Sequence, residues 1–256
     1  MRSVAIFTNE EKDQGLEYTN VVKDFLEKQD IQVSIGYSET VDLLVVLGGD
    51  GTVLNISHKA AIDNIPVLGI NLGTMGFLTD VDKKDGIFSL EKVLANNFIT
   101  ENRIMLEVHR VTPLEQRLAL NEVCVGATGK LKTFDLYISN QFIDTIRADG
   151  IIISTPTGST AYNLSAGGPI LSPCGQMFVV TPICPHSLGS RPFVLSPSDS
   201  VRIIARNISP VIIDGEEREP LLKGEDIVVN KAAKHVTIMK TVVTNFYETL
   251  RKKKIL

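Results

Sequence analysis

The sequence contains few cysteines and few histidines, and neither set has the spacing of a metal site. The cysteines number three and include no C-x-x-C pair, which argues against a disulfide framework and against bound zinc. His58, His109 and His235 likewise lack metal-ligand spacing. We therefore predict no metal held by the protein alone, and we expect the cysteines to be small buried side chains: Cys124, Cys174 and Cys184.

The sequence also lacks an excess of basic residues and a long apolar segment. Its formal net charge is −4, whereas nucleic-acid binding relies on Lys and Arg to neutralise phosphates. The one basic run, residues 251–254, is interpreted as a solvated tail without a function. The apolar stretch Val4–Phe7 is too short for a signal peptide or a membrane span. We therefore expect a cytoplasmic protein with neither a nucleic-acid nor a membrane partner.

Length and composition indicate a folded chain with two domains. The 256 residues are 43% hydrophobic and 22% charged, which is typical of a globular protein. We place an α/β domain that binds a phosphate donor at residues 1–100 and a mostly β domain at residues 101–238. The sequence does not decide the secondary structure or the position of the C-terminal segment 239–256. One possibility is that this segment returns and packs against the first domain.

The first hundred residues alternate between apolar runs and amphipathic segments, which is typical of an open parallel sheet covered by helices. The run at 41–47 is apolar throughout and is therefore expected at the centre of that sheet. Strands are predicted at 4–7, 31–35, 41–47 and 66–70, and helices at 16–28, from the end of the 48–52 loop to about 62, and at 90–96.

From Asn102 onward the pattern changes to short apolar runs separated by Gly, Pro, Asn or Ser, which predicts a mostly β second domain. Strands are expected at 104–111, 117–125, 135–138, 150–154, 201–205, 211–213 and 226–229. Residues 240–250 alternate or are weakly helical, so their type stays open.

A glycine-rich loop, Gly48-Gly49-Asp50-Gly51-Thr52, follows a buried strand and precedes a helix. Ligands bind at this place in open α/β sheets, and the missing side chains let backbone N–H groups approach phosphates. The alternative is a plain tight turn with Thr52 as the helix N-cap and glycines at positive φ. A carboxylate beside phosphates is repelled unless a metal intervenes or it accepts a proton, so Asp50 favours a catalytic loop.

This loop is neither a Walker A motif, which carries a following lysine, nor a G-x-G-x-x-G dinucleotide fingerprint. Without that lysine, neutralisation of the donor phosphates is expected to come largely from Mg²⁺. A second loop at 154–169 is rich in hydroxyls and glycines and contains one aromatic residue, Tyr162. It can offer polar groups to a ribose and a ring to a heterocycle, or it can be a Ser/Thr-rich surface loop.

Together these residues resemble the NAD kinase family. The resemblance rests on the 48–52 loop, on Asn121-Glu122, and on Asp149-Gly150 leading into residues 155–169, and it extends to residues 181–188. The GGDG sequence alone is also similar to loops of diacylglycerol and sphingosine kinases and of phosphofructokinases. The long second motif is far more specific, and it favours NAD kinase.

The resemblance implies a kinase that moves a phosphoryl group from ATP or polyphosphate, with Mg²⁺, to the 2′-hydroxyl of the adenosine ribose of NAD. Gly48, Gly49, Gly51 and Thr52 would hold the phosphates, and Asp50 would orient or deprotonate the hydroxyl. The implied NAD-binding residues, some of them lent by a neighbouring subunit, are Asn121, Glu122, Asp149, Thr160, Ala161, Tyr162 and Ser165.

A homo-oligomer, as a rule a tetramer in similar enzymes, follows from those shared residues. Two other functions remain open at this level. One is a lipid or sugar kinase that shares the GGDG loop, which the acidic charge and the absence of an exposed apolar helix disfavour. The other is a nucleotide sensor without turnover, which the retained Asp50 disfavours.

Overall fold

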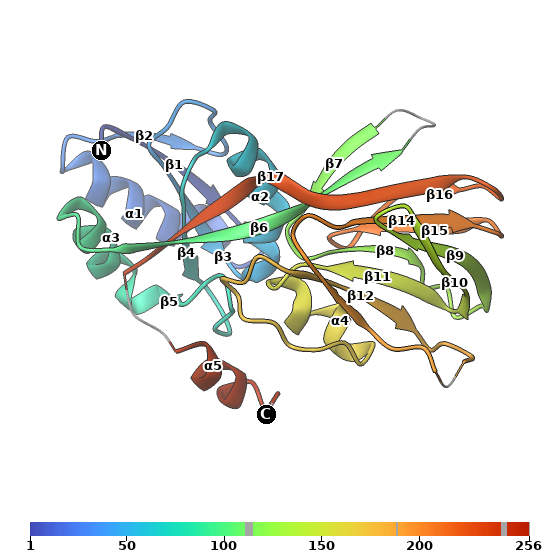
Figure 1. The fold of residues 1–256 in the computed structure, drawn as a ribbon. Helices are drawn as coiled ribbons and strands as arrows, with labels where there is room; N and C mark the ends of the chain where they lie inside the picture. The colour runs from blue at the N-terminus through green and yellow to red at the C-terminus, as the bar shows by residue number, and fades with distance from the viewer. Residues whose placement is uncertain (111–114, 188, 242–244, 256) are drawn as a thin grey trace. The chain divides into compact units, whose positions relative to one another are not determined.

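The computed structural model describes residues 1–110, 115–187, 189–241 and 245–255 (Figure 1). The chain divides into two compact units. Unit 1 comprises residues 1–102 and 236–256, and unit 2 comprises residues 103–235. Val111, Leu188 and residues 242–244, which fall within segments discussed above, lie outside the described residues. The boundaries of both units fall inside two long strands, β6 (Ile99–Arg110) and β17 (Asp226–Lys240).

Unit 1 contains a parallel sheet in which β3 is central. The strands lie in the order β2-β1-β3-β4, the end of β17 pairs with β4 through Ile238 and Val67, and β5 lies beside β4. Every residue of β3 is buried because β1 and β4 flank it. The predicted parallel α/β sheet is confirmed, with strands β1 (Ser3–Thr8), β2 (Gln32–Ile35), β3 (Leu43–Gly48), β4 (Val67–Asn71) and β5 (Val81–Asp82).

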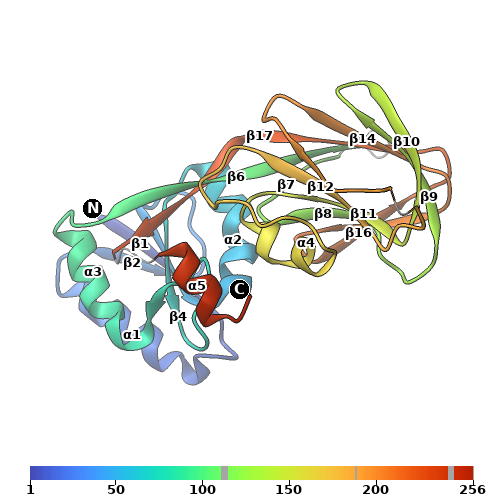
Figure 2. The same ribbon diagram turned by 60° about the horizontal axis from the view of Figure 1, so that its bottom comes forward.

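Helices follow the strands of unit 1 as expected. Tyr18, Val22 and Leu26 of α1 share one apolar core with Leu90 and Val93 of α3, so these two helices cover the same face of the sheet (Figure 2). The sequence left the type of the C-terminal segment undecided. The structure forms a helix there, α5. The helices are η1 (Gln14–Leu16), α1 (Glu17–Glu27), α2 (Asp50–Asp63), η2 (Lys83–Asp85), α3 (Gly86–Leu94) and α5 (Phe246–Lys252).

Unit 2 is mostly β and is built from two antiparallel sheets that share one core. One sheet has the order β13-β12-β11-β8-β15-β16, and in the other β10, β9, β14 and β17 are neighbours. Alternate residues point inward, so Val123 and Val125 of β8 join the core whereas Glu122 and Cys124 lie on the outer face. The strands are β7 (Glu115–Ala119), β8 (Glu122–Gly126), β9 (Lys132–Ile138), β10 (Gln141–Ala148), β11 (Gly150–Ser154), β12 (Phe178–Ile183), β13 (Phe193–Leu195), β14 (Ser200–Ala205), β15 (Ser209–Ile213) and β16 (Glu216–Leu221).

The expected single strand at 117–125 is wrong, because the chain breaks between β7 and β8. The backbone N–H groups of Leu120, Asn121 and Glu122 donate to the Asp214 carboxylate at 2.7, 2.8 and 3.0 Å. Those donors therefore serve a side chain instead of a strand ladder. Helix α3 also begins four residues before the predicted start at Leu90.

The expectation for the cysteines is wrong for two of the three. Cys124 is buried, whereas Cys174 and Cys184 are exposed, and all three are free thiols. Cys184 has φ of +45°, so it lies in a turn directly after β12, outside the packed strand. Among the described residues, no helix is both long and apolar enough to cross a membrane.

Candidate active site

The glycine-rich loop of unit 1 is the turn from β3 into α2. Gly49 is the N-cap of α2, and its N–H donates to Thr52 Oγ1 at 3.2 Å. A Cβ at Gly48 would lie 2.2 Å from the same oxygen, so Gly48 is required by the close approach of Thr52. Thr52 therefore stands three residues inside the helix, and the three glycines of the loop are outside the positive-φ region. The plain-turn alternative predicted that Thr52 is the N-cap and that the glycines have positive φ. Both predictions are wrong.

Gly51 has no such structural reason to be glycine. A Cβ at this residue would meet no atom of the protein within 4 Å, and the residue is exposed in the first turn of α2. The N–H groups of a first helical turn have no acceptor within the helix, and the helix dipole places positive potential there. The open side of this turn can therefore accept an anion such as a phosphate.

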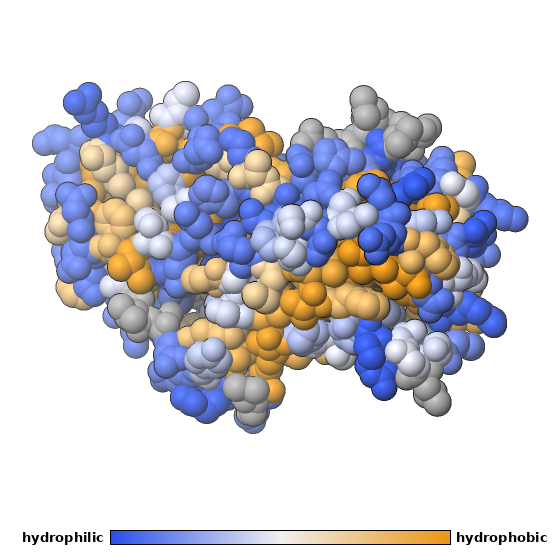
Figure 3. Space-filling model, in the orientation of Figure 1, coloured by the Kyte–Doolittle hydropathy of each residue, from blue (hydrophilic) through white to orange (hydrophobic). Residues whose placement is uncertain are grey.

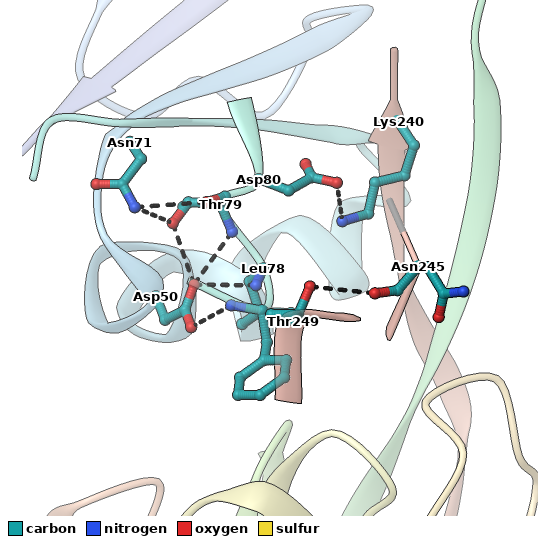
Figure 4. A network of polar contacts seen from close by, with 9 residues as sticks. Asp50, Asn71, Leu78, Thr79, Asp80, Lys240, Asn245 and Thr249 are labelled. Atoms are coloured by element: carbon teal, nitrogen blue, oxygen red, sulfur yellow. Dashed lines mark hydrogen bonds and ion pairs between the residues drawn. The ribbon is translucent and has the colours of Figure 1, made fainter. Parts of the chain in front are cut away.

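Asp50 is fixed by a separate segment of the chain, residues 77–79. Its Oδ1 accepts hydrogen bonds from Leu78 N at 2.9 Å, Thr79 N at 3.1 Å and Thr79 Oγ1 at 3.1 Å, and its Oδ2 accepts one from Phe77 N at 2.7 Å. Figure 4 shows the carboxylate enclosed by these donors. The side chain is half-buried and held in one orientation before any substrate binds.

The segment that fixes Asp50 was missed at the sequence level. A Cβ at Gly76 would lie 1.8 Å from Asp50 Oδ1, so this glycine is needed for the approach. Asn71, at the end of β4, holds the segment by donating from Nδ2 to Thr74 O at 2.5 Å and to Thr79 Oγ1 at 3.2 Å. Two glycines, Gly73 and Gly76, soon after a buried strand were the signal available in the sequence.

The end of this segment is anchored by a buried ion pair. Lys240 Nζ lies 2.7 Å from Asp80 Oδ2, and the two side chains are 4% and 7% exposed (Figure 4). Lys240 is the last residue of β17, so the pair connects the C-terminal part of unit 1 to the segment that carries Phe77 and Thr79. Removing either partner would leave a buried charge, which is costly.

A cavity of about 350 Å³ opens beside the loop within unit 1. Its only carboxylate among the described residues is that of Asp50, and two lysines also line it. Two positive charges against one negative charge make the local balance +1, although the whole chain has a net charge of −4. The lining residues are Asn9, Lys12, Gly49, Asp50, Gly51, Thr52, Thr74, Gly76 and Lys253.

In unit 2, Asn121 and Glu122 lie at the start of β8, held by Asp214 as described above. Asp214 occupies the turn between β15 and β16 with φ of +50°, followed by Gly215 at +84°. Burial, followed by the charge of Asp214, raises the pKa of Glu122 to about 8. Glu122 Oε2 is buried and has no hydrogen-bond partner among the residues that the structure describes. An unpaired buried carboxyl oxygen is a candidate contact for a ligand hydroxyl.

The second loop separates into a structural part and an accessible part. Thr155 and Ser159 are buried, and their hydroxyls donate to Leu120 O at 2.6 Å and Pro156 O at 2.7 Å. These hydroxyls hold the loop, so the interpretation of the whole segment as a set of ligand contacts is too broad. The predicted residues Tyr162 and Ser165 are exposed, and Thr160 and Ala161 are partly so.

Three of the predicted residues of unit 2 are related by their charges, because Asp149 and Glu122 both act electrostatically on Tyr162. Asp149 precedes β11, and its carbonyl accepts from Ala127 N at 2.7 Å. Partial burial raises the pKa of Tyr162, and further contributions come from four acidic neighbours: Cys124, Cys184, Asp149 and Glu122. Tyr162 thus has Asp149 and Glu122 as ionisable neighbours within unit 2, whereas the 48–52 loop belongs to unit 1.

The fold and these sites define a two-domain kinase, in which an α/β unit carries a glycine-rich loop with a fixed carboxylate and a mostly β unit carries a loop rich in hydroxyl groups. Models of two families match the chain, the ATP-NAD kinase N-terminal domain at residues 36–98 and the ATP-NAD kinase C-terminal domain at residues 120–241. The chain belongs to the NAD kinase family. The expected fold and enzyme class are thereby confirmed, and the lipid-kinase, sugar-kinase and sensor alternatives are set aside.

Relatives and solved structures agree over nearly the whole chain. The NAD kinase of Thermoanaerobacter sp. (strain X514) is 36% identical over 99% of both chains, and that of Caldicellulosiruptor saccharolyticus is 37% identical over 98% of both. The crystal structure of an Archaeoglobus fulgidus NAD kinase in complex with ATP is 27% identical, with a TM-score of 0.83 over 100% of both chains. Yeast NADH kinase complexed with NADH is 26% identical, with a TM-score of 0.83 over 98% of this chain and 87% of that chain.

Proposed function

We propose that this enzyme transfers the terminal phosphoryl group of ATP, or of polyphosphate, to the 2′-hydroxyl of the adenosine ribose of NAD. The observation that carries the proposal is Asp50, a carboxylate fixed by four hydrogen bonds at the open N-terminus of α2. In the transfer, the 2′-oxygen bonds to the terminal phosphorus as the bond from that phosphorus to its bridging oxygen breaks. The hydroxyl proton passes to Asp50.

Within the carboxylate, Oδ2 is the oxygen suited to the hydroxyl. Oδ1 already accepts three hydrogen bonds, whereas Oδ2 accepts one from Phe77 N. A carboxylate oxygen readily accepts two or more hydrogen bonds, so Oδ2, which accepts only one, can also accept an incoming hydroxyl. Because the backbone donors hold the group before substrate binds, little reorganisation is needed during the reaction. Gly48, Gly49, Gly51 and Thr52 then form the phosphate-binding turn.

A divalent metal such as Mg²⁺ fits this cavity as a companion of the donor phosphates. The cavity offers oxygen atoms from Asn9, Asp50 and Thr74, which are ligands that Mg²⁺ accepts. Among the described residues there is no group of three His, Cys, Asp or Glu side chains suited to a metal, so phosphates and water would supply most ligands. When bound, the ion would neutralise charge on the phosphoryl oxygens.

For the acceptor, we propose that Asn121, Glu122, Asp149, Thr160, Ala161, Tyr162 and Ser165 bind the adenosine part of NAD. Three features support this assignment. Tyr162 is 40% exposed and can stack on a base, Glu122 Oε2 has no partner within the described part of the chain, and Asp149 and Glu122 both act electrostatically on Tyr162. We also propose that unit 2 forms a homo-oligomer, a tetramer, that shares these residues.

The first test is formation of NADP from NAD with ATP and Mg²⁺, measured with an NADP-specific dehydrogenase. Asp50→Asn removes the proton acceptor but keeps the shape of the side chain, so we expect kcat to fall about 100-fold or more. The matched control is Asp24→Asn on α1, because Asp24 is exposed and lies outside the cavity.

The control should keep the activity of the parent chain. A folded parent that makes no NADP from ATP or from polyphosphate would contradict the proposed reaction. An Asp50→Asn variant with parental kcat would leave the reaction intact and would overturn only the role of Asp50.

A further inference from the structure

The phosphate loop lacks the lysine of a Walker A motif, yet the cavity beside it contains two lysines from distant parts of the chain. Lys12 belongs to the turn after β1, and Lys253 directly follows α5 at the C-terminal end of unit 1. No pattern in the sequence connects them, since about 240 residues separate the two. The fold brings both to the turn that begins α2.

Lys12 is placed by its own backbone. Asn9 N donates to Leu47 O at 2.8 Å, and Lys12 N donates to Asn9 O at 3.0 Å, so the turn is tied to the end of β3. Lys12 Nζ lies 3.0 Å from the position that a Cβ on Gly49 would take and 3.7 Å from that on Gly73. The ammonium group therefore lies against both backbone segments that surround Asp50, where a longer side chain at Gly49 would displace it.

Lys253 is placed by an aromatic contact. The ring of Phe246 on α5 lies 5.9 Å from the ring of Phe77, and Lys253 Nζ lies 5.2 Å from the centre of the Phe77 ring. The N–H of Phe77 is the donor to Asp50 Oδ2. Phe77 thus contacts two groups. Its backbone N–H holds the Asp50 carboxylate, and its ring contacts the ammonium group of Lys253.

We propose that Lys12 and Lys253 bind the phosphate chain of the donor and together take the place of the lysine that the loop lacks. This inference rests on the proposed function, because it assigns further contacts to the same donor site. Charge supports it, since the two ammonium groups face a single carboxylate whose oxygens already accept four backbone and hydroxyl donors. The net positive charge of such a cavity favours a polyanion.

The adjacent lysine provides the contrast. Lys252 lies 2.9 Å from Glu248 on the same helix and is outside the cavity. The interpretation of residues 251–254 as a uniform solvated tail predicts that Lys252 and Lys253 are equivalent. The arrangement predicts instead that only Lys253 responds to phosphate.

The experiment measures binding of inorganic tripolyphosphate by calorimetry and the KM values for ATP and NAD, in parallel. The variants are Lys12→Met and Lys253→Met. The matched controls are Lys252→Met and Lys23→Met, since Lys23 pairs with Glu27 on α1 at 3.8 Å. We expect each test variant to weaken tripolyphosphate binding and to raise the KM for ATP about tenfold, as for loss of a charge-assisted hydrogen bond.

The KM for NAD and the melting temperature should stay at parental values, because no ion pair of Lys12 or Lys253 is found within the described ranges. Lys12→Arg and Lys253→Arg should recover most of the affinity. If the parent makes NADP while both Met variants bind tripolyphosphate as the controls do, the two lysines are not donor ligands and the inference fails alone. If the parent makes no NADP, the proposed function itself fails.

Discussion

At the scale of single residues, Glu122 and Asp214 carry two buried carboxyl groups that interact with each other in unit 2. Burial raises the pKa of Asp214 to about 6, even though three backbone N–H groups favour its charged form. Glu122 is raised further, to about 8, first by burial and then by Asp214. Asp214 therefore orients the Asn121–Glu122 segment, and Glu122 carries a proton near neutral pH that it can donate to a ligand.

The raised pKa of Glu122 has a consequence for stability. The folded protein binds this proton up to about pH 8, whereas the unfolded chain releases it near the ordinary value of 4.5. The free energy of unfolding therefore falls as pH rises between these values, by at most about 1.4 kcal/mol per pH unit. Asp214, with a pKa of about 6, is largely ionised above pH 7, so the range from pH 7 to 8 reports mainly on Glu122.

We expect Glu122→Gln to flatten the fall of the melting temperature between pH 7 and pH 8, as measured by calorimetry. The stability of the variant relative to the parent should rise by about 1 kcal/mol over this range. Glu248→Gln is the control, because Glu248 pairs with Lys252 on the surface and its lowered pKa places its titration below this range. Parallel curves for Glu122→Gln and the parent would show that Glu122 is ionised throughout.

At the scale of elements, strand-to-helix turns explain what the sequence could and could not predict. The β3–α2 turn was predictable because its glycines and Asp50 are contiguous and follow an apolar run. Residues 76–79, which hold Asp50, and the distant residues Lys12 and Lys253 were not, because the fold alone brings them to that turn. Strand β16, with the sequence EEREPL, was missed because its charged residues lack the apolar alternation of a strand.

Two glycines near Asp50 give opposite expectations for the same substitution. Gly76→Ala places a Cβ 1.8 Å from Asp50 Oδ1, so the carboxylate must move and kcat should fall about 100-fold. Gly51→Ala meets no protein atom within 4 Å and lies in a helix, so the melting temperature should be equal or higher. If phosphate passes over this turn, the same methyl group raises the KM for ATP.

Melting curves and steady-state kinetics of the two alanine variants separate these effects. The expected pattern is a stable Gly51→Ala with weakened ATP use and a Gly76→Ala whose main loss is in kcat. Parental kcat in Gly76→Ala would mean that the position of Asp50 is not critical. Parental KM for ATP in Gly51→Ala would place the phosphates away from this turn.

At the scale of the whole molecule, the division of labour between the two units follows from their construction. Unit 1 is a parallel sheet whose central strand β3 leads into the glycine-rich loop, whereas unit 2 is a pair of antiparallel sheets with one shared core. The change of pattern near residue 102 in the sequence reflects this difference, because covered parallel strands are apolar throughout whereas antiparallel strands alternate. The return of residues 236–256 to unit 1 depends on the pairing of Ile238 with Val67 and on the ion pair of Lys240, which no local pattern encodes.

The outer face of the unit 2 sheet is the surface on which we expect the proposed tetramer to form. Figure 3 shows apolar side chains gathered over β8, β11 and β12. Val194 of the neighbouring β13 pairs with Val179, and it lies on the same face as Ile152 and Cys124. Ile152 and Cys124 are themselves buried, whereas Val194 is 51% and Phe193 38% exposed, and exposed apolar side chains of this kind are typical of a protein interface.

Val194→Glu tests this surface, because a charge buried at an interface without a partner opposes association. The matched control is Val21→Glu on α1, since Val21 is 50% exposed in unit 1. Light scattering after size exclusion should give the parent and the control four times the 28.0 kDa chain mass, and Val194→Glu a smaller assembly. Because Glu122 and Tyr162 lie on the same face, the smaller assembly should also have a raised KM for NAD. A monomeric parent would contradict the tetramer, and an intact Val194→Glu tetramer would place the interface elsewhere.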